Sequence, residues 1–208
     1  MLVVILGAGG HGQVVADILF NMWRNGRDLE IYGFLDDDPT LTGTSVMGIK
    51  VLGSRDILGE LSHDALVAAI GDNTVRKSFF ESLSETEVFI PAIHPSAVIA
   101  PDVQVKSGAM VCAGAIINPG TSIGSNAIVN TGALLDHHNK IGAHSHVAPG
   151  VNLGGNVTVG EGAFIGIGAS VIPGITIGAG AIVGAGAVVV RDIPAAETWV
   201  GVPAHKLG

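Results

Sequence analysis

Hydrophobic residues recur along most of this chain with a single fixed period. From Ile99 onward an aliphatic residue stands at every sixth position, for sixteen consecutive positions. The series is Ile99, Val105, Val111, Ile117, Ile123, Val129, Leu135, Ile141, Val147, Leu153, Val159, Ile165, Val171, Ile177, Val183 and Val189. A period of six fits neither an α-helix nor a flat strand. It is typical of a parallel β-helix, in which each hexad is one short strand and one turn.

Three hexads make one triangular coil of about eighteen residues, so residues 99–190 predict about five coils. The pattern resembles that of the left-handed hexapeptide-repeat β-helices, whereas a β-sandwich would not keep one phase over this length. Glycine directly follows several members of the series, at Gly142, Gly160, Gly166, Gly178 and Gly184. We expect these small residues to allow tight corners with positive φ.

The first ninety residues show the alternation of an α/β domain instead. Three continuous apolar runs predict strands buried on both faces, at residues 2–6, 31–35 and 66–70. Two helical patterns follow the first and third runs, over residues 13–23 and 74–84. The sequence therefore predicts a small Rossmann-like parallel sheet in residues 1–90 and a β-helix with a short C-terminal tail in residues 91–208. Pro91 and Pro95 mark the junction.

Composition excludes several classes of protein. The 208 residues include 31 glycines, and the formal net charge is −8. The apolar content is too high for a disordered chain, and 10 Lys and Arg against 18 Asp and Glu cannot dominate a phosphate backbone, so no nucleic acid is expected as partner. A single cysteine, Cys112, excludes an internal disulfide and a Cys-rich zinc site, and it indicates a reducing, cytoplasmic setting.

One segment imitates a membrane span. Residues 162–190 carry no charge and are long enough to cross a bilayer. They contain several glycines and Pro173, however, and they keep the period of six, for which a transmembrane helix has no reason. Met1 leads into an apolar run without preceding basic residues, which predicts no signal peptide. We therefore expect a soluble protein with no membrane partner.

A G-x-G-x-x-G motif at residues 7–12 lies between the first strand and the first helix, where helix N–H groups can meet a phosphate. Read alone, it suggests an NAD-linked oxidoreductase. Ninety residues hold only one mononucleotide half of that fold, however, and the β-helix supplies no second half. A nucleoside diphosphate suits these parts better, with its diphosphate over residues 10–12 and its base or ribose toward Asp36 and Asp37.

Four of the eight histidines fall within ten residues: His137, His138, His144 and His146. None lies at the inward phase of the hexads, so a role in the core is not predicted. Neutral imidazole can act as a general base near pH 7. Ordinary surface histidines and a three-histidine zinc site remain alternative interpretations. The lone Cys112 is a further candidate nucleophile.

Additional motifs match a narrower family along nearly the whole chain. They lie at residues 7–12, 35–37, 69–73 with Arg76, 93–95, 130–131, 136–137, 142, 171–174, 177–178, 183–186 and 201–204. With these motifs the chain resembles the bacterial hexapeptide-repeat sugar acyltransferases. That family includes UDP-4-amino-sugar and GDP-perosamine N-acetyltransferases and sialic acid O-acetyltransferases.

The resemblance implies transfer of acetyl from acetyl-CoA to the 4-amino group of a nucleotide-linked amino-deoxysugar, in bacterial surface-glycan biosynthesis. It implies His137 as the general base, with Asp136 and His138 as its catalytic neighbours. The implied substrate-binding residues are Gly10, His11, Gly12, Asp36, Asp37, Gly71, Asn73 and Asn130. The implied acetyl-CoA-binding residues are His146, Ile167 and Ala185.

The chain departs from the family pattern directly after the base, where the family usually has an Asp or Glu to orient the ring and this chain has His138. That leaves Asp136, a backbone carbonyl or a neighbouring subunit as candidates for orienting His137. The resemblance also implies a homotrimer with the active site in the cleft between adjacent β-helices.

A thioester is already activated, so the reaction needs no metal and no covalent intermediate, only positioning, removal of a proton and an oxyanion site. The alternative functions are sialic acid or polysaccharide O-acetylation, an NAD-linked oxidoreductase, and a non-enzymatic β-helix scaffold.

Overall fold

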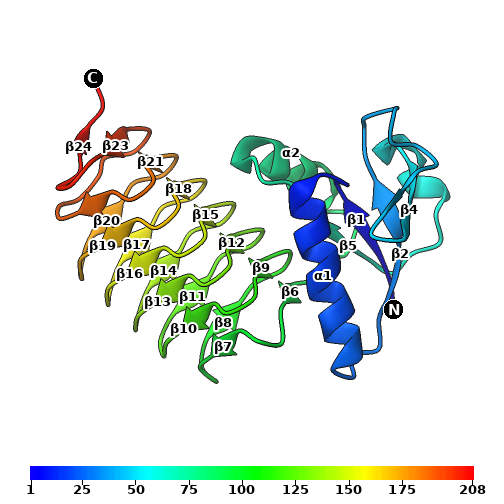
Figure 1. Ribbon diagram of the computed structural model, residues 1–208, viewed down its shortest axis with the longest axis horizontal. Helices are drawn as coiled ribbons and strands as arrows, with labels where there is room; N and C mark the ends of the chain where they lie inside the picture. Colours follow the sequence, from blue (N-terminus) through cyan, green and yellow to red (C-terminus); the bar gives the residue numbers. More distant parts are fainter.

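The computed structural model describes residues 1–208 and shows a small α/β domain packed against one side of a long prism of stacked coils (Figure 1). The strands of the prism pair in parallel, as β10 does with β13, where Ile116 lies opposite Leu134 one coil further along. The predicted fold class, an α/β domain followed by a left-handed parallel β-helix, is thereby confirmed.

The α/β sheet has five strands in the order β3-β4-β2-β1-β5. Their bounds are β1 (Leu2–Leu6), β2 (Glu30–Leu35), β3 (Ser45–Val46), β4 (Ile49–Gly53) and β5 (Ala65–Ala68). Strands β1, β2, β4 and β5 are parallel, but β3 runs antiparallel to β4, so the sheet is mixed rather than wholly parallel as predicted. The turn between β3 and β4 has positive φ at both Met47 and Gly48, which is the geometry that two-residue hairpins favour. Methionine in place of the usual Asn or Asp hid this hairpin in the sequence.

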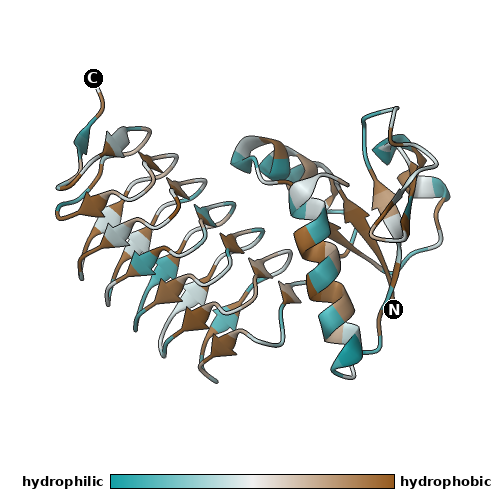
Figure 2. Ribbon diagram, viewed as in Figure 1, coloured by the Kyte–Doolittle hydropathy of each residue, from teal (hydrophilic) through white to brown (hydrophobic).

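Helices cover both faces of the sheet. The helix α1 (Gly10–Arg24) lies on one face, and η1 (Arg55–Glu60) and α2 (Asn73–Leu83) lie on the other. Figure 2 shows α1 striped with hydrophobic and hydrophilic residues. Its buried side chains pack partly on the sheet and partly on the first coils, where they meet Ala92, Met110, Cys112 and Ile128. The same helix therefore stabilises the domain and docks it on the prism.

The prism has three faces, each a parallel sheet. The docked face, which α1 contacts, consists of β6 (Ala92–Ile93), β9 (Met110–Val111), β12 (Ile128–Val129), β15 (His146–Val147), β18 (Phe164–Ile165), β21 (Ile182–Val183), β23 (Thr198–Val200) and β24 (His205–Lys206), of which β24 alone is antiparallel. The second face consists of β7 (Val98–Ile99), β10 (Ile116–Ile117), β13 (Leu134–Leu135), β16 (Asn152–Leu153), β19 (Ser170–Val171) and β22 (Val188–Val189). The third face consists of β8 (Gln104–Val105), β11 (Ser122–Ile123), β14 (Lys140–Ile141), β17 (Thr158–Val159) and β20 (Thr176–Ile177).

Three edges join these faces, and their names are kept below. The first edge joins the docked face to the second face, at residues 112–114, 130–132, 148–150, 166–168 and 184–186. The second edge joins the second face to the third, at residues 118–120, 136–138, 154–156 and 172–174. The third edge leads back to the docked face, at residues 106–108, 124–126, 142–144, 160–162 and 178–180.

The aliphatic series fills the interior of the prism. Every member from Val111 to Val189 is buried, and the first two, Ile99 and Val105, are half-buried where the stack begins. No helix of the structure is both long and apolar enough to cross a membrane. The uncharged residues 162–190 form strands and corners of successive coils.

The tight corners lie elsewhere than predicted. Glycines directly after the aliphatic residues do not have positive φ; they are needed because the next coil approaches closely, and a Cβ on Gly160 would lie 2.4 Å from the backbone nitrogen of Ala179. Positive φ occurs three residues after each aliphatic, at Gly108, Gly114, Gly120, Asn126, Gly132, His138, His144, Gly150, Asn156, Gly162, Gly168, Gly174, Gly180 and Gly186. Two of the clustered histidines, His138 and His144, thus occupy corners where glycine is the rule.

Candidate active site

The predicted catalytic residues Asp136, His137 and His138 lie together on the second edge, directly after β13. The Asp136 carboxylate accepts hydrogen bonds from the backbone N–H of His137 (2.8 Å) and from the Asn118 amide (3.1 Å). These two bonds lower the pKa of Asp136, with the His137 N–H as the larger cause. Asp136 therefore holds the backbone of the corner and does not contact the imidazole of His137.

The neighbouring histidine contacts the ring instead. Nδ1 of His137 lies 3.0 Å from Nδ1 of His138, and the two rings are nearly perpendicular at 79°. One nitrogen of such a pair must carry the proton and the other must accept it. We assign the proton to His137 Nδ1, which leaves its Nε2 with a free lone pair. This is the tautomer that a general base requires.

Two glycines that sequence reasoning missed make room for these rings. A Cβ on Gly155 would lie 2.5 Å from Cε1 of His137, and a Cβ on Gly120 would lie 2.7 Å from Cδ2 of His138. Each glycine stands one coil away from the histidine that it accommodates. The register of the coils would have identified both, because residues 120 and 138, and 137 and 155, are stacked neighbours.

The predicted phosphate loop forms the first turn of α1. The helix begins at Gly10, and Gly9 precedes it without a side chain to cap the free N–H groups of the first turn. Those groups, including the N–H groups of Gly10 and His11, suit an anion. Gly12 has a packing role, because a Cβ there would lie 2.1 Å from the carbonyl oxygen of Gly7.

Asp36 and Asp37 follow β2 and are both engaged with neighbouring backbone. Asp36 accepts from the N–H of Ala8 (2.7 Å) and from the N–H of Asp38 (2.9 Å). Asp37 accepts from the N–H of Arg55 (3.1 Å) and pairs with its Nε at 3.4 Å. Asp36 thus ties the end of β2 to the glycine-rich loop. Each carboxylate oxygen retains a second acceptor position for a ligand hydroxyl.

A groove of about 420 Å³ connects this loop to the prism. One wall is the first part of α1, including Gly10 and Asp17, and the other includes His94, Ala113 and Thr131. Ala113 and Thr131 belong to the first edge. The groove therefore leads from the predicted phosphate loop to the edge that carries Asn130.

Three further predicted residues gather beside that groove. The Asn130 amide donates to Nε2 of His146 (3.0 Å), which places the proton of the neutral ring on Nδ1. The rings of His146 and His11 have centroids 6.3 Å apart. Burial, and secondarily the charge of Arg76, lower the pKa of each histidine to about 4. Both rings are therefore neutral at pH 7.

Two nitrogens of this cluster lack a hydrogen-bond partner although they are buried, Nε2 of His11 and Nδ1 of His146. A buried polar atom without a partner costs on the order of 1–3 kcal/mol. Such atoms concentrate where a protein serves something other than its own stability. Two of them side by side indicate a site for a polar ligand.

Gly71 and Asn73 belong to the contact between domain and prism. The Asn73 amide donates to the carbonyl oxygens of Gly162 (2.9 Å) and Ala163 (3.2 Å), and its Oδ1 accepts from Arg76 (2.9 Å). The carbonyl of Gly71 also accepts from Arg76, at 3.3 Å. The side chain of Asn73 is thereby occupied within the protein, so a contact to the nucleotide at this point would come from backbone atoms.

The predicted acetyl-CoA residues Ile167 and Ala185 lie one above the other on the first edge, and Ile167 is 61% exposed. Every corner of this edge is glycine, at Gly114, Gly132, Gly150, Gly168 and Gly186. A Cβ on the last four would meet no other atom within 4 Å. The first edge is thus a smooth strip without projecting corner side chains, whereas the other two edges carry His or Asn at some corners.

Within one chain, the predicted site residues form two groups. Asp136, His137 and His138 lie on the second edge, while Asn130, His146, Ile167, Ala185 and the α1 loop lie at or beside the first. The whole second face separates the groups. The structure therefore does not bring His137 to Asn130 in a single chain.

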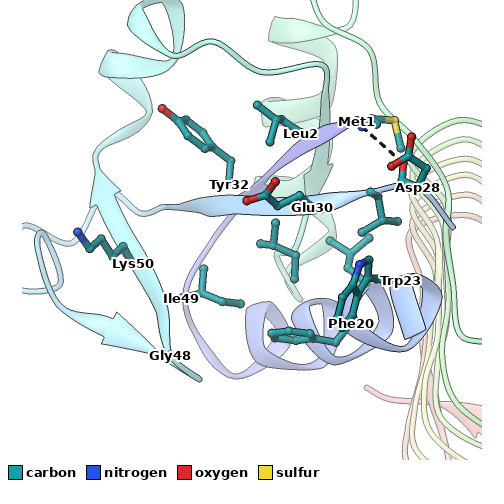
Figure 3. A pocket seen from close by; sticks show the side chains of 13 residues that line it. Met1, Leu2, Phe20, Trp23, Asp28, Glu30, Tyr32, Gly48, Ile49 and Lys50 are labelled. Carbon is teal, nitrogen blue, oxygen red and sulfur yellow. Dashed lines mark hydrogen bonds between the residues drawn. The ribbon is translucent and has the colours of Figure 1, made fainter. Parts of the chain in front are cut away.

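The largest cavity lies apart from all of these residues. It has a volume of about 870 Å³ and lies at the C-terminal part of α1, where Phe20, Trp23 and Tyr32 border it (Figure 3). It contains none of the predicted site residues. The predicted phosphate loop is at the opposite end of the same helix.

Comparisons with known proteins address the same two parts of the chain. Residues 2–83 match the PglD N-terminal domain, residues 156–191 match the bacterial transferase hexapeptide (six repeats), and residues 140–166 match the hexapeptide repeat of succinyl-transferase. A histidine-to-alanine variant of GDP-perosamine N-acetyltransferase from Caulobacter crescentus, crystallised with CoA and GDP-perosamine, is 42% identical. The match covers 100% of this chain and 97% of that chain, with a TM-score of 0.92. The chain belongs to the PglD-like hexapeptide N-acetyltransferases.

Two further relatives agree with this assignment. The acetyltransferase domain of PglB from Neisseria gonorrhoeae is 35% identical with a TM-score of 0.91, and the match covers 99% of both chains. UDP-N-acetylbacillosamine N-acetyltransferase from Bacillus subtilis is 41% identical over 115 residues, which is about half of each protein, 53% of this chain and 51% of the relative. The predicted resemblance is therefore confirmed. As a PglD-like N-acetyltransferase, the chain joins a predicted nucleotide-sugar domain to an acyltransferase prism.

Proposed function

We propose that this chain transfers the acetyl group of acetyl-CoA to the 4-amino group of a nucleotide-linked amino-deoxysugar. The observation that carries the proposal is the histidine pair on the second edge, where His138 holds Nδ1 of His137 and leaves Nε2 of that exposed ring free. A relative that covers this chain completely, at 42% identity, was crystallised with CoA and GDP-perosamine. That sugar nucleotide belongs to the proposed substrate class.

In the proposed reaction, the sugar amine attacks the carbonyl carbon of the thioester and Nε2 of His137 accepts the proton that the amine loses. The tetrahedral oxyanion needs N–H donors, as in other acyl transfers. Its collapse breaks the C–S bond, and the imidazolium returns the proton to the departing CoA sulfur. Positioning and one general base are sufficient, because the thioester is already activated.

The only cysteine does not compete for this role. Cys112 is completely buried under α1, and burial raises the pKa of its thiol to about 12. The thiol is protonated and inaccessible at neutral pH, so a covalent acyl-cysteine has no support. A single reduced cysteine also fits the cytoplasmic setting that we propose for the enzyme.

We further propose a homotrimer whose active sites lie between neighbouring prisms. Along the second face, Val98, Ile116 and Leu134 expose apolar side chains. A depression of about 520 Å³ on this face also includes Asp136, directly beside the predicted base. A neighbouring first edge seated along the second face would bring Asn130 of one chain to His137 of another.

The decisive experiment offers the purified protein acetyl-CoA with UDP- and GDP-linked 4-amino-deoxysugars, and with sialic acid in parallel. We expect mass spectrometry to show one added acetyl group on an amino sugar, and the faster carrier identifies the nucleotide. Acetylation of sialic acid alone would favour the O-acetyltransferase interpretation. No turnover of any nucleotide amino sugar would overturn the proposal.

The His138 position predicts a measurable effect of charge on the base. At this left-handed corner (φ 59°), Asp and Asn are better tolerated than most residues, and they differ from each other only in charge and hydrogen bonding. We expect His138→Asn to lower kcat by about 10-fold, and His138→Asp to exceed His138→Asn, because a carboxylate stabilises the imidazolium that forms on His137. Steady-state kinetics of both variants tests this, and equal rates would contradict it.

A further inference from the structure

The most deeply buried charge of the molecule lies outside the proposed chemistry. Arg76, on α2, has an exposed fraction of 0% and donates six hydrogen bonds. None of its acceptors is a carboxylate: five are backbone carbonyls and one is the side-chain oxygen of Asn73. Burial lowers the pKa of Arg76 to about 10, so the guanidinium remains charged at neutral pH.

The acceptors come from both parts of the molecule. Within the α/β domain they are Ile70 O (3.0 Å), Gly71 O (3.3 Å) and Asn73 Oδ1 (2.9 Å). On the prism they are Asn126 O (3.0 Å), His144 O (2.7 Å) and Ser145 O (3.3 Å). The guanidinium thus lies between the loop after β5 and two successive corners of the third edge.

The rest of α2 supports this contact from one helical face. Asn73, Arg76, Lys77 and Phe80 follow the spacing i, i+3, i+4 and i+7, and all four side chains meet the third edge. Lys77 pairs with Glu161, and the ring of Phe80 lies 5.6 Å from that of His144. The Asn126 amide completes the network by donating to Arg76 O and contacting Nδ1 of His144. The non-glycine residues at these two corners, Asn126 and His144, both take part in docking.

We propose that Arg76 is a positioning residue, which fixes the loop at Gly71 and the glycine-rich end of α1 relative to the coil that carries His146. The inference rests on the proposed function for the roles of these two parts, but the geometry itself does not. Arg76 bonds directly to the carbonyl of Ser145, the residue before His146, and to Gly71 on the other side. A small displacement at Arg76 would therefore change the distance between the predicted nucleotide site and the groove beside Asn130.

Arginine is required because one group must reach six acceptors on two bodies. Its planar guanidinium carries five N–H donors in a fixed fork, whereas the lysine ammonium is a compact point charge with three donors. Lysine would keep the charge but leave several buried carbonyls without a donor. The charge also acts at a distance, since Arg76 contributes, after burial, to the low pKa of His11 and of His146. Geometry and charge can therefore be separated by substitution.

The test compares Arg76→Lys and Arg76→Met, with Lys77→Met as a control that removes a more exposed cation from the same interface. We expect Arg76→Lys to lower kcat on the order of 10²-fold, the scale of a 1 Å misplacement, with both KM values within about 3-fold of wild type. Lys77→Met should keep kcat within about 2-fold, since exposed ion pairs contribute little. Rates are measured well below the unfolding temperature of each variant. Wild-type kcat in Arg76→Lys, or equal losses in it and Lys77→Met, would overturn the proposal.

A second readout does not depend on turnover. The ring protons of His11 and His146 are titrated by NMR in the full chain. Arg76→Met should raise the pKa of both histidines, whereas Arg76→Lys should leave the pKa low and shift the resonances of residues 144–146 and 70–71. Unchanged resonances in Arg76→Lys would contradict the positioning role, and they decide it alone if Arg76→Met does not fold. An inactive wild-type protein would count against the proposed function and leave this titration as the test of Arg76.

Discussion

Replacement of His137 by alanine is expected to lower kcat roughly 10²–10⁴-fold and to leave the fold unchanged. The loss is large because no other group on the second edge is placed to accept the amine proton. The carboxylate of Asp136 is bound to the backbone and to Asn118, and Nδ1 of His138 faces the substituted ring itself. The fold should persist because His137 is exposed and lies outside the aliphatic core.

The measurement is steady-state turnover together with thermal unfolding of the same preparation. His205→Ala is a matched control, because His205 is also exposed but lies in the C-terminal strand β24. We expect this control to keep wild-type kcat. If His137→Ala retained more than about a tenth of the rate, the general-base assignment would be wrong, because removal of a general base costs at least about 10²-fold.

The prism could be predicted from sequence because every hexad repeats the same physical requirement. One aliphatic residue must point inward in each hexad, and no other part of the molecule competes for it, so the pattern from Val111 to Val189 maps directly onto the core. The hairpin of β3 and β4 lacked such a signal, since its strands are short and its turn begins with Met47. The role of the glycines was misjudged for a different reason. Their need arises from the next coil, eighteen residues away, and not from their own corner.

The same register explains what could be predicted of the candidate site. Asn130 and His137 are seven residues apart, a little more than one hexad, and this spacing alone places them on different edges of a triangular coil. The contacts of the α/β domain could not be obtained in this way. The approach of His11 to His146 and the docking of Arg76 depend on how α1 and α2 sit on the prism, and no periodicity in the sequence encodes that orientation.

The separation of these two groups leads to the second large effect, in mixtures of inactive chains. Asn130→Ala removes the amide that donates to His146 on the first edge, and His137→Ala removes the base on the second edge. Each variant should be nearly inactive alone. If the site combines the second edge of one chain with the first edge of its neighbour, a 1:1 mixture assembled from unfolded or co-expressed chains contains sites with both edges intact. With random assembly, roughly a quarter of the sites have wild-type residues on both edges, so about a quarter of wild-type activity should return.

A pair of variants on the same edge provides the control. Asp136→Ala and His137→Ala both alter the second edge, so no arrangement of neighbours restores an intact site, and their mixture should remain inactive. Recovery in the first mixture and none in the second would locate the reaction between chains. Because the whole second face lies between His137 and Asn130 in one chain, a site confined to a single chain predicts no recovery in either mixture. That result would contradict the proposed homotrimeric site, whatever the oligomeric state found by sedimentation.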